Sequence, residues 1–461
     1  MVWTIKQLEE ALSIKLTITD GDFGKIQFNS LDVDPGDIFI ALQGNRDGHD
    51  FIQDALNRGA KIAIISKNTQ GIDLSKLIFV KDTFQALMDL AVYKRQNLST
   101  KFIAVTGSVG KTSTKEALKL MLSAYGKTFA SHGTFNNHIG VPLSLASIPN
   151  DAEYAVIEMG MNAKGELSQL SNLVKPDVVI ITTISEGHIE FFESVEDIAD
   201  AKCEILEGLE VSQGKAIINR DMDMYERCIE NMHKLDIQNL YSFGERIDAN
   251  IRLVSHELLE DNQLRLVYKF DSDQIEILLS SLPLHFAINF AGALAVIKAL
   301  KLDPELAAQA LCSFVTTIGR GKLVHEVNNG KEYQIIADYY NANPQSLVAS
   351  LAYLEQIEHP SKVAILGDMR ELGEKSLALH KSVTKHIMAA GVNKLFLVGE
   401  FMPQIMNNVN KNIIVQCFSD VEELLTQIDS YLQGGELILI KGSRGMQLEK
   451  VANKLGVQDA L

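Results

Sequence analysis

A glycine-rich segment that ends in a lysine and two hydroxyl residues is the strongest chemical signal in this sequence. It lies between the β-forming run FIAV and an amphipathic helical pattern, and it consists of Gly107, Ser108, Val109, Gly110, Lys111, Thr112 and Ser113. Glycines let backbone amides approach a polyphosphate, and the N-terminus of the following helix adds partial positive charge. Lys111 can reach β- and γ-phosphate oxygens, and the Thr112 hydroxyl can bind Mg²⁺. The segment therefore predicts a site for ATP and Mg²⁺.

This loop is shorter than the full phosphate-loop pattern, because Val105 stands where the pattern has its first glycine. The alternative interpretation is a glycine-rich turn between a strand and a helix that binds nothing. The lysine and threonine at the start of the helix favour the phosphate loop.

Two polar residues follow later β-rich runs. Glu158 closes the run EYAVIEMG, and His188 comes shortly after DVVIITTIS. Ligands of open α/β sheets bind beyond the carboxyl ends of the strands, so both residues are candidates for a site. Each has a plain alternative, since a strand-end glutamate can cap a helix and a lone histidine can be a surface or core residue. Together, after a phosphate loop, they indicate a metal site.

A lysine lies on the apolar stripe of the next expected helix. Lys202 falls four residues after Ile198 and three before Ile205 in VEDIADAKCEILEGL. A buried cation is costly unless it is paired, or unless its amine reacts with CO₂ to form a carbamate, an anion that can bind Mg²⁺. The alternatives are a side chain that extends to the surface or an ion pair with Glu196 or Asp197. The spacing leaves these possibilities open.

The elements that must position these residues predict an α/β protein of three domains. The 461 residues suggest about three domains. We expect a small α/β domain over residues 1–82, a central phosphate-loop domain with a parallel sheet over 83–313, and a Rossmann-like α/β domain over 314–461. The central strands are KFIAVTG, EYAVIEMG, DVVIITTIS and KAIINRD, and the later ones are YQIIADYY, KVAILGD, NKLFLVGE and ELILIKGS. Glycines in VTTIGRGKL suggest a hinge.

Composition excludes several classes of protein. The formal charge of −16 opposes broad binding of nucleic acid or of an anionic membrane surface. The four cysteines are scattered without a CxxC pattern, so neither a zinc site nor a disulfide framework is expected. No apolar run approaches the roughly 20 residues that span a bilayer, and the N-terminus lacks the pattern of a signal peptide. We expect a soluble cytoplasmic protein.

The same residues resemble those of the Mur ligases, the ATP-dependent amide ligases of peptidoglycan synthesis, over nearly the whole chain. The similar segments are TGSVGKTSTK, IEMGMNAKGEL, HIEFFESVEDIADAKCEIL, ADYYNANPQS, LGDMRELGEKS and KGSRGMQLE. YNANP followed by LGDM and ELG is specific to the branch that adds D-alanyl-D-alanine. The N-terminal DVDPGDIFIALQGNRDGHDFI is similar to the domain that holds the UDP end of the precursor.

The resemblance implies roles for individual residues. It puts Lys111 on the ATP phosphates, Thr112 and Glu158 on one Mg²⁺, and His188 with a carbamylated Lys202 on a second. It also implies contacts of ATP with Asn289 on the adenine side, with Arg320 at the hinge and with Asp338 near the ribose. It implies substrate contacts of Ser30 with UDP and of Asn136 and Asn137 with the precursor. Leu31 stands where the family commonly has an arginine, so the UDP pocket is expected to differ.

The resemblance implies an enzyme that joins UDP-N-acetylmuramoyl-tripeptide to D-alanyl-D-alanine through an acyl phosphate and forms ADP. We expect a monomer, although the sequence does not reveal the oligomeric state. Lysine and diaminopimelate both remain open as the third residue of the tripeptide. One alternative is another ligase of this architecture, such as a folylpolyglutamate synthase or the ligase that adds the third stem residue. Another is a phosphate-loop switch that binds ATP without making an amide, which would leave Glu158, His188 and Lys202 without a role.

Overall fold

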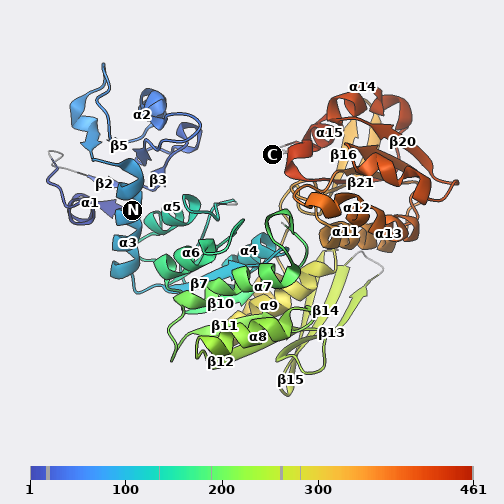
Figure 1. Cartoon of the computed structure of the whole chain (residues 1–461), viewed down its shortest axis with the longest axis horizontal. Coiled ribbons are helices and arrows are strands. Elements are labelled where there is room, and N and C mark those ends of the chain that lie inside the picture. The colour runs from blue at the N-terminus through green and yellow to red at the C-terminus, as the bar shows by residue number, and fades with distance from the viewer. Residues whose placement is uncertain are drawn as a thin grey trace.

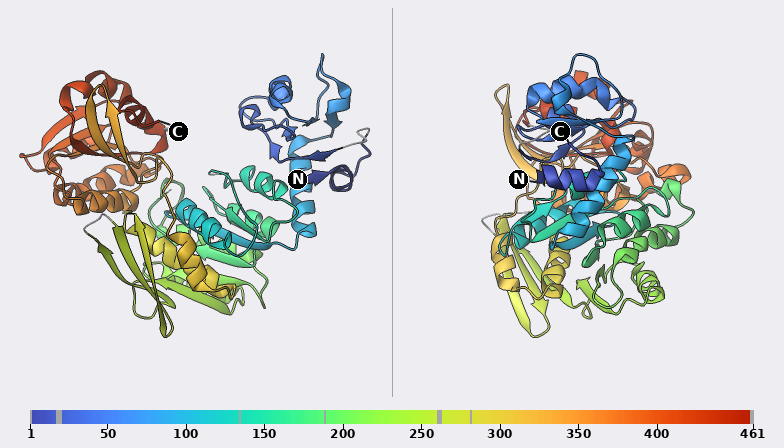
Figure 2. Two further views of the ribbon diagram at one scale, coloured as in Figure 1. Left: turned by 180° about the vertical axis from the view of Figure 1, so that it is seen from behind. Right: turned by 90° about the vertical axis from the view of Figure 1, so that its left-hand side faces the viewer.

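Three α/β units follow one another along the chain in the computed structural model, which describes residues 2–16, 21–133, 135–187, 189–259, 263–280 and 282–458. The N-terminal and C-terminal units stand apart at opposite ends of the central unit and on the same side of it (Figure 1). The view from behind in Figure 2 shows the same U-shaped arrangement. The three-domain α/β class expected from the sequence is confirmed, whereas the boundaries at residues 82 and 313 stay predictions.

The N-terminal unit is built on a small parallel sheet. Its strands, in sheet order, are β3 (Ile26–Gln27), β4 (Ile38–Ile40), β5 (Ile62–Ile65) and β6 (Leu77–Phe79), and β1 (Trp3–Thr4) pairs separately with β2 (Asp22–Phe23). Its helices are α1 (Ile5–Leu12), α2 (Ile52–Arg58) and α3 (Thr83–Asn97), with 3₁₀ turns at Ser30–Asp32, Gly48–Phe51 and Leu74–Lys76. A capping box between Thr4 and Gln7 starts α1. Leu87 and Leu90 of α3 pack in one core with Trp3 of this unit and with Leu143 and Ala146 of the central unit, so α3 joins the two units.

The central unit has a nine-stranded sheet. In sheet order its strands are β15 (Asp273–Ser280), β14 (Gln263–Phe270), β13 (Ile251–Leu258), β12 (Asn239–Gly244), β11 (Lys215–Asn219), β10 (Val178–Ile181), β7 (Lys101–Thr106), β9 (Tyr154–Glu158) and β8 (Thr128–Ala130). The strands from β8 to β13 pair in parallel, whereas β13, β14 and β15 pair antiparallel. The sequence analysis did not anticipate these last three strands.

Helices cover both faces of this sheet. They are α4 (Lys111–Leu122), α5 (Gly140–Ala146), α6 (Glu166–Val174), α7 (Val195–Cys203), α8 (Tyr225–Lys234), α9 (His285–Ala299) and α10 (Pro304–Leu311), with 3₁₀ turns at Ile189–Phe191 and Glu204–Gly208. Alternate residues of β7 point to opposite faces: Ile103 packs in the core with α4, α9 and α10, while Phe102 packs in the core with α6, α7 and α8. The sheet is therefore buried on both sides, which explains the unbroken apolar runs in its parallel strands.

The C-terminal unit has a six-stranded sheet in the order β16 (Lys322–Asn328), β17 (Lys331–Ala337), β21 (Glu436–Lys441), β18 (Lys362–Gly367), β19 (Lys394–Val398) and β20 (Ile414–Phe418). Only the β16–β17 pair is antiparallel. The helices are α11 (Pro344–Gln356), α12 (Ser376–Ser382), α13 (Thr384–Ala389), α14 (Val421–Tyr431) and α15 (Glu449–Lys454), with 3₁₀ turns at Gly373–Lys375, Met402–Asn408 and Arg444–Met446. Across the ranges described above, no helix is long and apolar enough to cross a membrane.

Candidate active site

The glycine-rich segment forms a tight turn between β7 and the N-terminus of α4. Gly107 has φ 152°, and a Cβ atom there would lie 1.9 Å from Thr182 Oγ1, so no other residue fits without a shift. The Thr182 hydroxyl donates a hydrogen bond to the Val109 carbonyl at 2.6 Å, and the Ser108 amide donates to the Thr183 carbonyl at 2.7 Å. The loop is thus fixed against the end of β10, and the first amides of the following helix have no acceptor within the helix.

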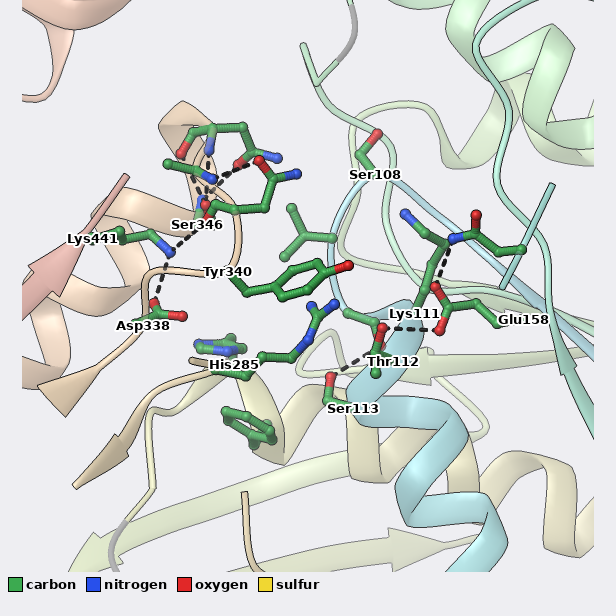
Figure 3. A pocket seen from close by; sticks show the side chains of 18 residues that line it. Ser108, Lys111, Thr112, Ser113, Glu158, His285, Asp338, Tyr340, Ser346 and Lys441 are labelled. Atoms are coloured by element: carbon green, nitrogen blue, oxygen red, sulfur yellow. Dashed lines mark hydrogen bonds and ion pairs between the residues drawn. The ribbon is translucent and has the colours of Figure 1, made fainter. Parts of the chain in front are cut away.

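A cavity of about 310 Å³ opens beside this loop, between the central and C-terminal units (Figure 3). Its lining comes from the loop, β9, the start of α9, the hinge and the carboxyl ends of β17 and β21. The lining residues are Ser108, Val109, Gly110, Lys111, Thr112, Ser113, Asn136, Glu158, His285, Phe286, Arg320, Asp338, Tyr340, Asn341, Ala342, Asn343, Ser346 and Lys441. A phosphate-binding loop on one wall and basic residues on the other suit a nucleoside triphosphate.

Glu158 lies at the carboxyl end of β9 and is nearly fully buried. One of its carboxylate oxygens accepts a hydrogen bond from the Thr112 hydroxyl at 2.9 Å, and the other accepts from the Asn136 amide at 2.9 Å. A carboxylate beside a hydroxyl at a phosphate loop fits Mg²⁺, which takes few protein ligands together with phosphate oxygens and water. In the described part of the chain, no three histidine, cysteine or acidic side chains group as metal ligands.

Lys111 lies where two cavities meet. Its amine donates to the Gly107 carbonyl at 2.6 Å, and its side chain lines both the first cavity and a second one of about 250 Å³. Burial lowers the pKa of Lys111, the negative charge of Glu158 opposes that shift, and the charge of Arg320 adds to it. The second cavity is lined by Lys111, Asn136, Asn137, His138, Gly160, Met161, Asn162, Glu166, Gln169, Leu170 and Lys202. A bound γ-phosphate beside Lys111 would therefore face the second cavity.

Lys202 is on α7 and lines the second cavity, and its side chain is 1% exposed. It does not extend to the surface. Asp197, one suggested ionic partner, instead pairs with Lys164 and accepts a hydrogen bond from the hydroxyl of Ser194, the N-cap residue of α7. No hydrogen bond or ion pair holds the Lys202 amine within the ranges that the structure describes, and burial lowers its pKa well below the ordinary value, with a further contribution from the charge of Lys111. This amine is therefore biased toward its neutral, nucleophilic form.

The nucleotide side of the first cavity contains an ion pair and a stacked arginine. Lys441 Nζ lies 2.7 Å from Asp338 Oδ2, and the Arg320 guanidinium carbon lies 4.1 Å from the centre of the Tyr340 ring. Figure 3 shows Tyr340 between the Asp338–Lys441 pair and the Thr112–Glu158 pair. Arg320 and Asp338 thus both line the first cavity, and their contacts with ATP stay predictions.

Asn289, which the resemblance put on the adenine side of ATP, packs against the loop, and its contact with adenine stays a prediction. It lies on α9 behind the loop, where its amide donates to the Ser113 hydroxyl at 2.9 Å. A Cβ atom at Gly110 would lie 2.6 Å from its amide oxygen, so Asn289 packs directly under the loop. In this structure Asn289 supports the loop and is not among the residues that line the cavity.

His285 and Phe286 at the start of α9 line the cavity below Arg320, and their rings lie 4.6 Å apart. Burial lowers the pKa of His285 to about 4, although the nearby Asp338 opposes the shift. His285 is therefore neutral near pH 7.

Of the candidate residues that the structure describes, Ser30, Gly107 and Asn289 line neither cavity. Ser30 belongs to the N-terminal unit, where it is buried and its hydroxyl, by hydrogen bonding to Asp54, is the main cause that lowers the pKa of that carboxyl. Leu31 beside it is 65% exposed. His188 lies outside the described residues. Asn137 lines the second cavity, and its side-chain oxygen accepts from the Gly140 amide at 2.9 Å, which orients the start of α5.

The sequence analysis assigned no role to several residues of the cavities. Tyr340, Asn341, Asn343, Ser346 and Lys441 line the first cavity, and Asn162, Glu166 and Gln169 line the second. These residues could have been found from the sequence, because most of them lie in segments that resemble the Mur ligases, namely ADYYNANPQS, KGSRGMQLE and IEMGMNAKGEL.

Comparisons with known proteins identify the family of the chain. Three family models match the chain, described as the Mur ligase family catalytic domain over residues 23–94, the Mur ligase middle domain over 105–297 and the Mur ligase glutamate ligase domain over 319–444. The UDP-N-acetylmuramoyl-tripeptide–D-alanyl-D-alanine ligase of Rickettsia prowazekii is 44% identical over 98% of this chain and 99% of its own. A crystal structure of MurF from Acinetobacter baumannii matches with a TM-score of 0.81 and 28% identity over 99% of both chains. The MurF ligase of Thermotoga maritima in complex with ADP matches with a TM-score of 0.74 and 27% identity over 94% of this chain and 97% of that one. The chain belongs to the Mur ligase family.

Proposed function

We propose that this protein is the ATP-dependent ligase that joins D-alanyl-D-alanine to UDP-N-acetylmuramoyl-tripeptide and forms ADP. The observation that carries the proposal is the full-length similarity to a ligase of that name, at 44% identity over 98% of the chain. The site geometry supports it, because the nucleotide cavity and the second cavity meet at Lys111 and Asn136. ATP as a substrate favours a cytoplasmic location, and since one chain lines both cavities we propose a monomer.

The reaction must convert a carboxylate, which is a poor electrophile, into an activated acyl group. We propose that the terminal carboxylate of the tripeptide, bound in the second cavity, attacks the γ-phosphorus of ATP bound in the first. Lys111 would neutralise charge on the transferred group, and its position between the cavities holds the two reactants in line. Thr112 and Glu158 would hold Mg²⁺, which supplies charge neutralisation on the phosphates. The loop amides at the N-terminus of α4 would hold the remaining phosphate oxygens.

The amine of D-alanyl-D-alanine would then attack the acyl phosphate and release inorganic phosphate. The wall of the second cavity contains amide side chains, from Asn136, Asn137 and Asn162, that can hold substrate oxygens. We propose Lys202 as a carbamate that holds a second Mg²⁺ together with His188. Rotation of the C-terminal unit toward the loop would exclude water from the intermediate, since an exposed acyl phosphate hydrolyses.

The UDP end of the precursor would bind to the N-terminal unit near Ser30. The exposed Leu31 side chain cannot donate a hydrogen bond to a phosphate, unlike the arginine that the family commonly has there.

The alternatives differ from this proposal in what they require of the substrates. A phosphate-loop switch would hydrolyse ATP without either substrate, and a folylpolyglutamate-type ligase would need different ones. The test is phosphate release with UDP-N-acetylmuramoyl-tripeptide and D-alanyl-D-alanine, supplied singly and together. The ligase releases phosphate rapidly only with both, and equal release without them would refute the proposal. Running the lysine and diaminopimelate tripeptides side by side would show which one is used.

A further inference from the structure

Lys115 lies one helical turn after Lys111 on α4 but faces away from both cavities. Its side chain is 0% exposed. A buried ammonium is stable only when its three donors are satisfied. Lys115 Nζ donates to the carbonyls of Ser131 and Gly133, both at 2.8 Å, and lies 3.1 Å from Glu116 Oε1. Two of its partners are therefore backbone groups of the segment that follows β8.

That segment carries the side chains at the junction of the two cavities. Asn136 lines both cavities, and Asn137 lines the second. Without a strand partner, the carbonyls of residues 131 and 133 need donors from elsewhere, and Lys115 supplies them. The conformation in which Asn136 and Asn137 reach the cavities thus depends on a buried cation beneath them.

The same cation lies close to Glu158. The Lys115 amine is 3.9 Å from Glu158 Oε2, and in the described ranges it is the one lysine or arginine nitrogen within 4.0 Å of that carboxylate. Further bonds join Glu158 to the same segment: its backbone amide donates to the Ser131 hydroxyl at 3.1 Å, and Asn136 donates to its carboxylate. The Gly160 amide donates to the Asn136 carbonyl at 2.8 Å, which closes the network.

We infer that Lys115 is a positioning residue that fixes the segment around Asn136 and Asn137 and orients Glu158 toward Thr112. This role rests on the proposed function, because it assigns Lys115 to the binding of the UDP-tripeptide through Asn136. Lys115 touches neither cavity and takes no part in the chemistry itself.

The first test measures backbone hydrogen exchange in the free protein, which needs no ligand. Lys115→Met removes the donors, and Lys119→Met is the matched control, since Lys119 lies one turn later on α4 and is exposed. We expect exchange to rise by about tenfold in peptides that cover residues 131–137 and 158–160 of Lys115→Met, and to be unchanged in Lys119→Met. Equal exchange in the two variants would overturn the inference whether or not the protein is a ligase.

The second test measures binding of UDP-tripeptide by calorimetry without ATP or Mg²⁺. We expect Lys115→Met and Asn136→Ala each to raise Kd about tenfold. The double variant should bind little more weakly than either single variant, because Lys115 acts on binding through Asn136. Additive losses would contradict action through Asn136. If Lys115→Met does not fold, Lys115→Gln is used in both tests, since its amide can donate to only one of the two carbonyls. Wild-type exchange rates and a wild-type Kd for Lys115→Gln would equally refute the inference. A wild-type protein that binds no UDP-tripeptide would instead refute the proposed function.

Discussion

Replacing Lys202 should separate activity from stability. The wild-type side chain is 1% exposed, and in the described ranges no ion pair offsets the desolvation of its charged form. Lys202→Met fills the same space without a charge, and we expect its free energy of unfolding to lie within about 1 kcal/mol of wild type or above it. Loss of a metal-binding anion should nevertheless lower kcat by about 10³-fold, which corresponds to about 4 kcal/mol of transition-state stabilisation.

Carbamate formation can be observed directly. A neutral amine attacks CO₂, a C–N bond forms, and a proton is released, so the low pKa of Lys202 favours the reaction. Protein equilibrated with ¹³C-labelled bicarbonate at pH 7.5 should show a carbamate carbon signal that Lys202→Ala lacks. Lys164→Ala is the matched control, because Lys164 is exposed and pairs with Asp197, which lies on α7 together with Lys202. The control should keep the signal and the activity.

Chemical rescue completes this test. Lys202→Ala leaves a space in which formate or acetate can supply the missing anion, so millimolar carboxylate should restore part of the activity. Lys202→Arg should not be rescued, since the guanidinium fills the space and does not react with CO₂. Full activity in Lys202→Ala, or a wild-type protein without the carbamate signal, would show that the reasoning is wrong.

Three further predictions concern the first cavity. Lys111→Ala should lower kcat by about 10³-fold or more with an unchanged melting temperature, and retention of a tenth of wild-type turnover would exclude the loop lysine from the mechanism. ATP and UDP-tripeptide together should make the protein more compact in small-angle scattering, and an unchanged profile at saturation would leave closure of the C-terminal unit unsupported. His285 has an ordinary pKa of 6.5 and a folded value of about 4, so the unfolded chain binds more protons and stability is lost as pH falls through that window. Relative to His285→Phe, the wild type should lose about 2 kcal/mol of unfolding free energy between pH 8 and pH 5, and parallel stability curves would contradict the burial argument.

The phosphate loop and the three-unit architecture could be predicted because their signals are local. Gly107 and Gly110 have backbone angles that favour glycine, and the parallel strands are buried on both faces and therefore read as apolar runs. Lys202 was also visible, since its place on an apolar stripe indicated burial. That no ion pair holds Lys202 in the described ranges could not be predicted, because pairing depends on where Asp197 and Lys164 meet in space.

Other features depend on contacts between distant segments. Asn289 lies on a helix that is buried almost all round, so its sequence does not tell which side faces the loop. The antiparallel strands β13 to β15 carry no chemical motif and extend the sheet away from the site. Lys115 looked like an ordinary helix residue, and only the fold brings it beneath residues 131 and 133.

Transfer of the γ-phosphate to the tripeptide carboxylate is the step on which the proposed function depends. It is tested most directly with UDP-N-acetylmuramoyl-tripeptide whose reacting carboxylate carries ¹⁸O in both oxygens, incubated with ATP, Mg²⁺ and D-alanyl-D-alanine. Mass spectrometry should find one ¹⁸O atom in each released inorganic phosphate, one in the new amide, and unlabelled ADP. Unlabelled phosphate, or AMP carrying the label, would contradict the account.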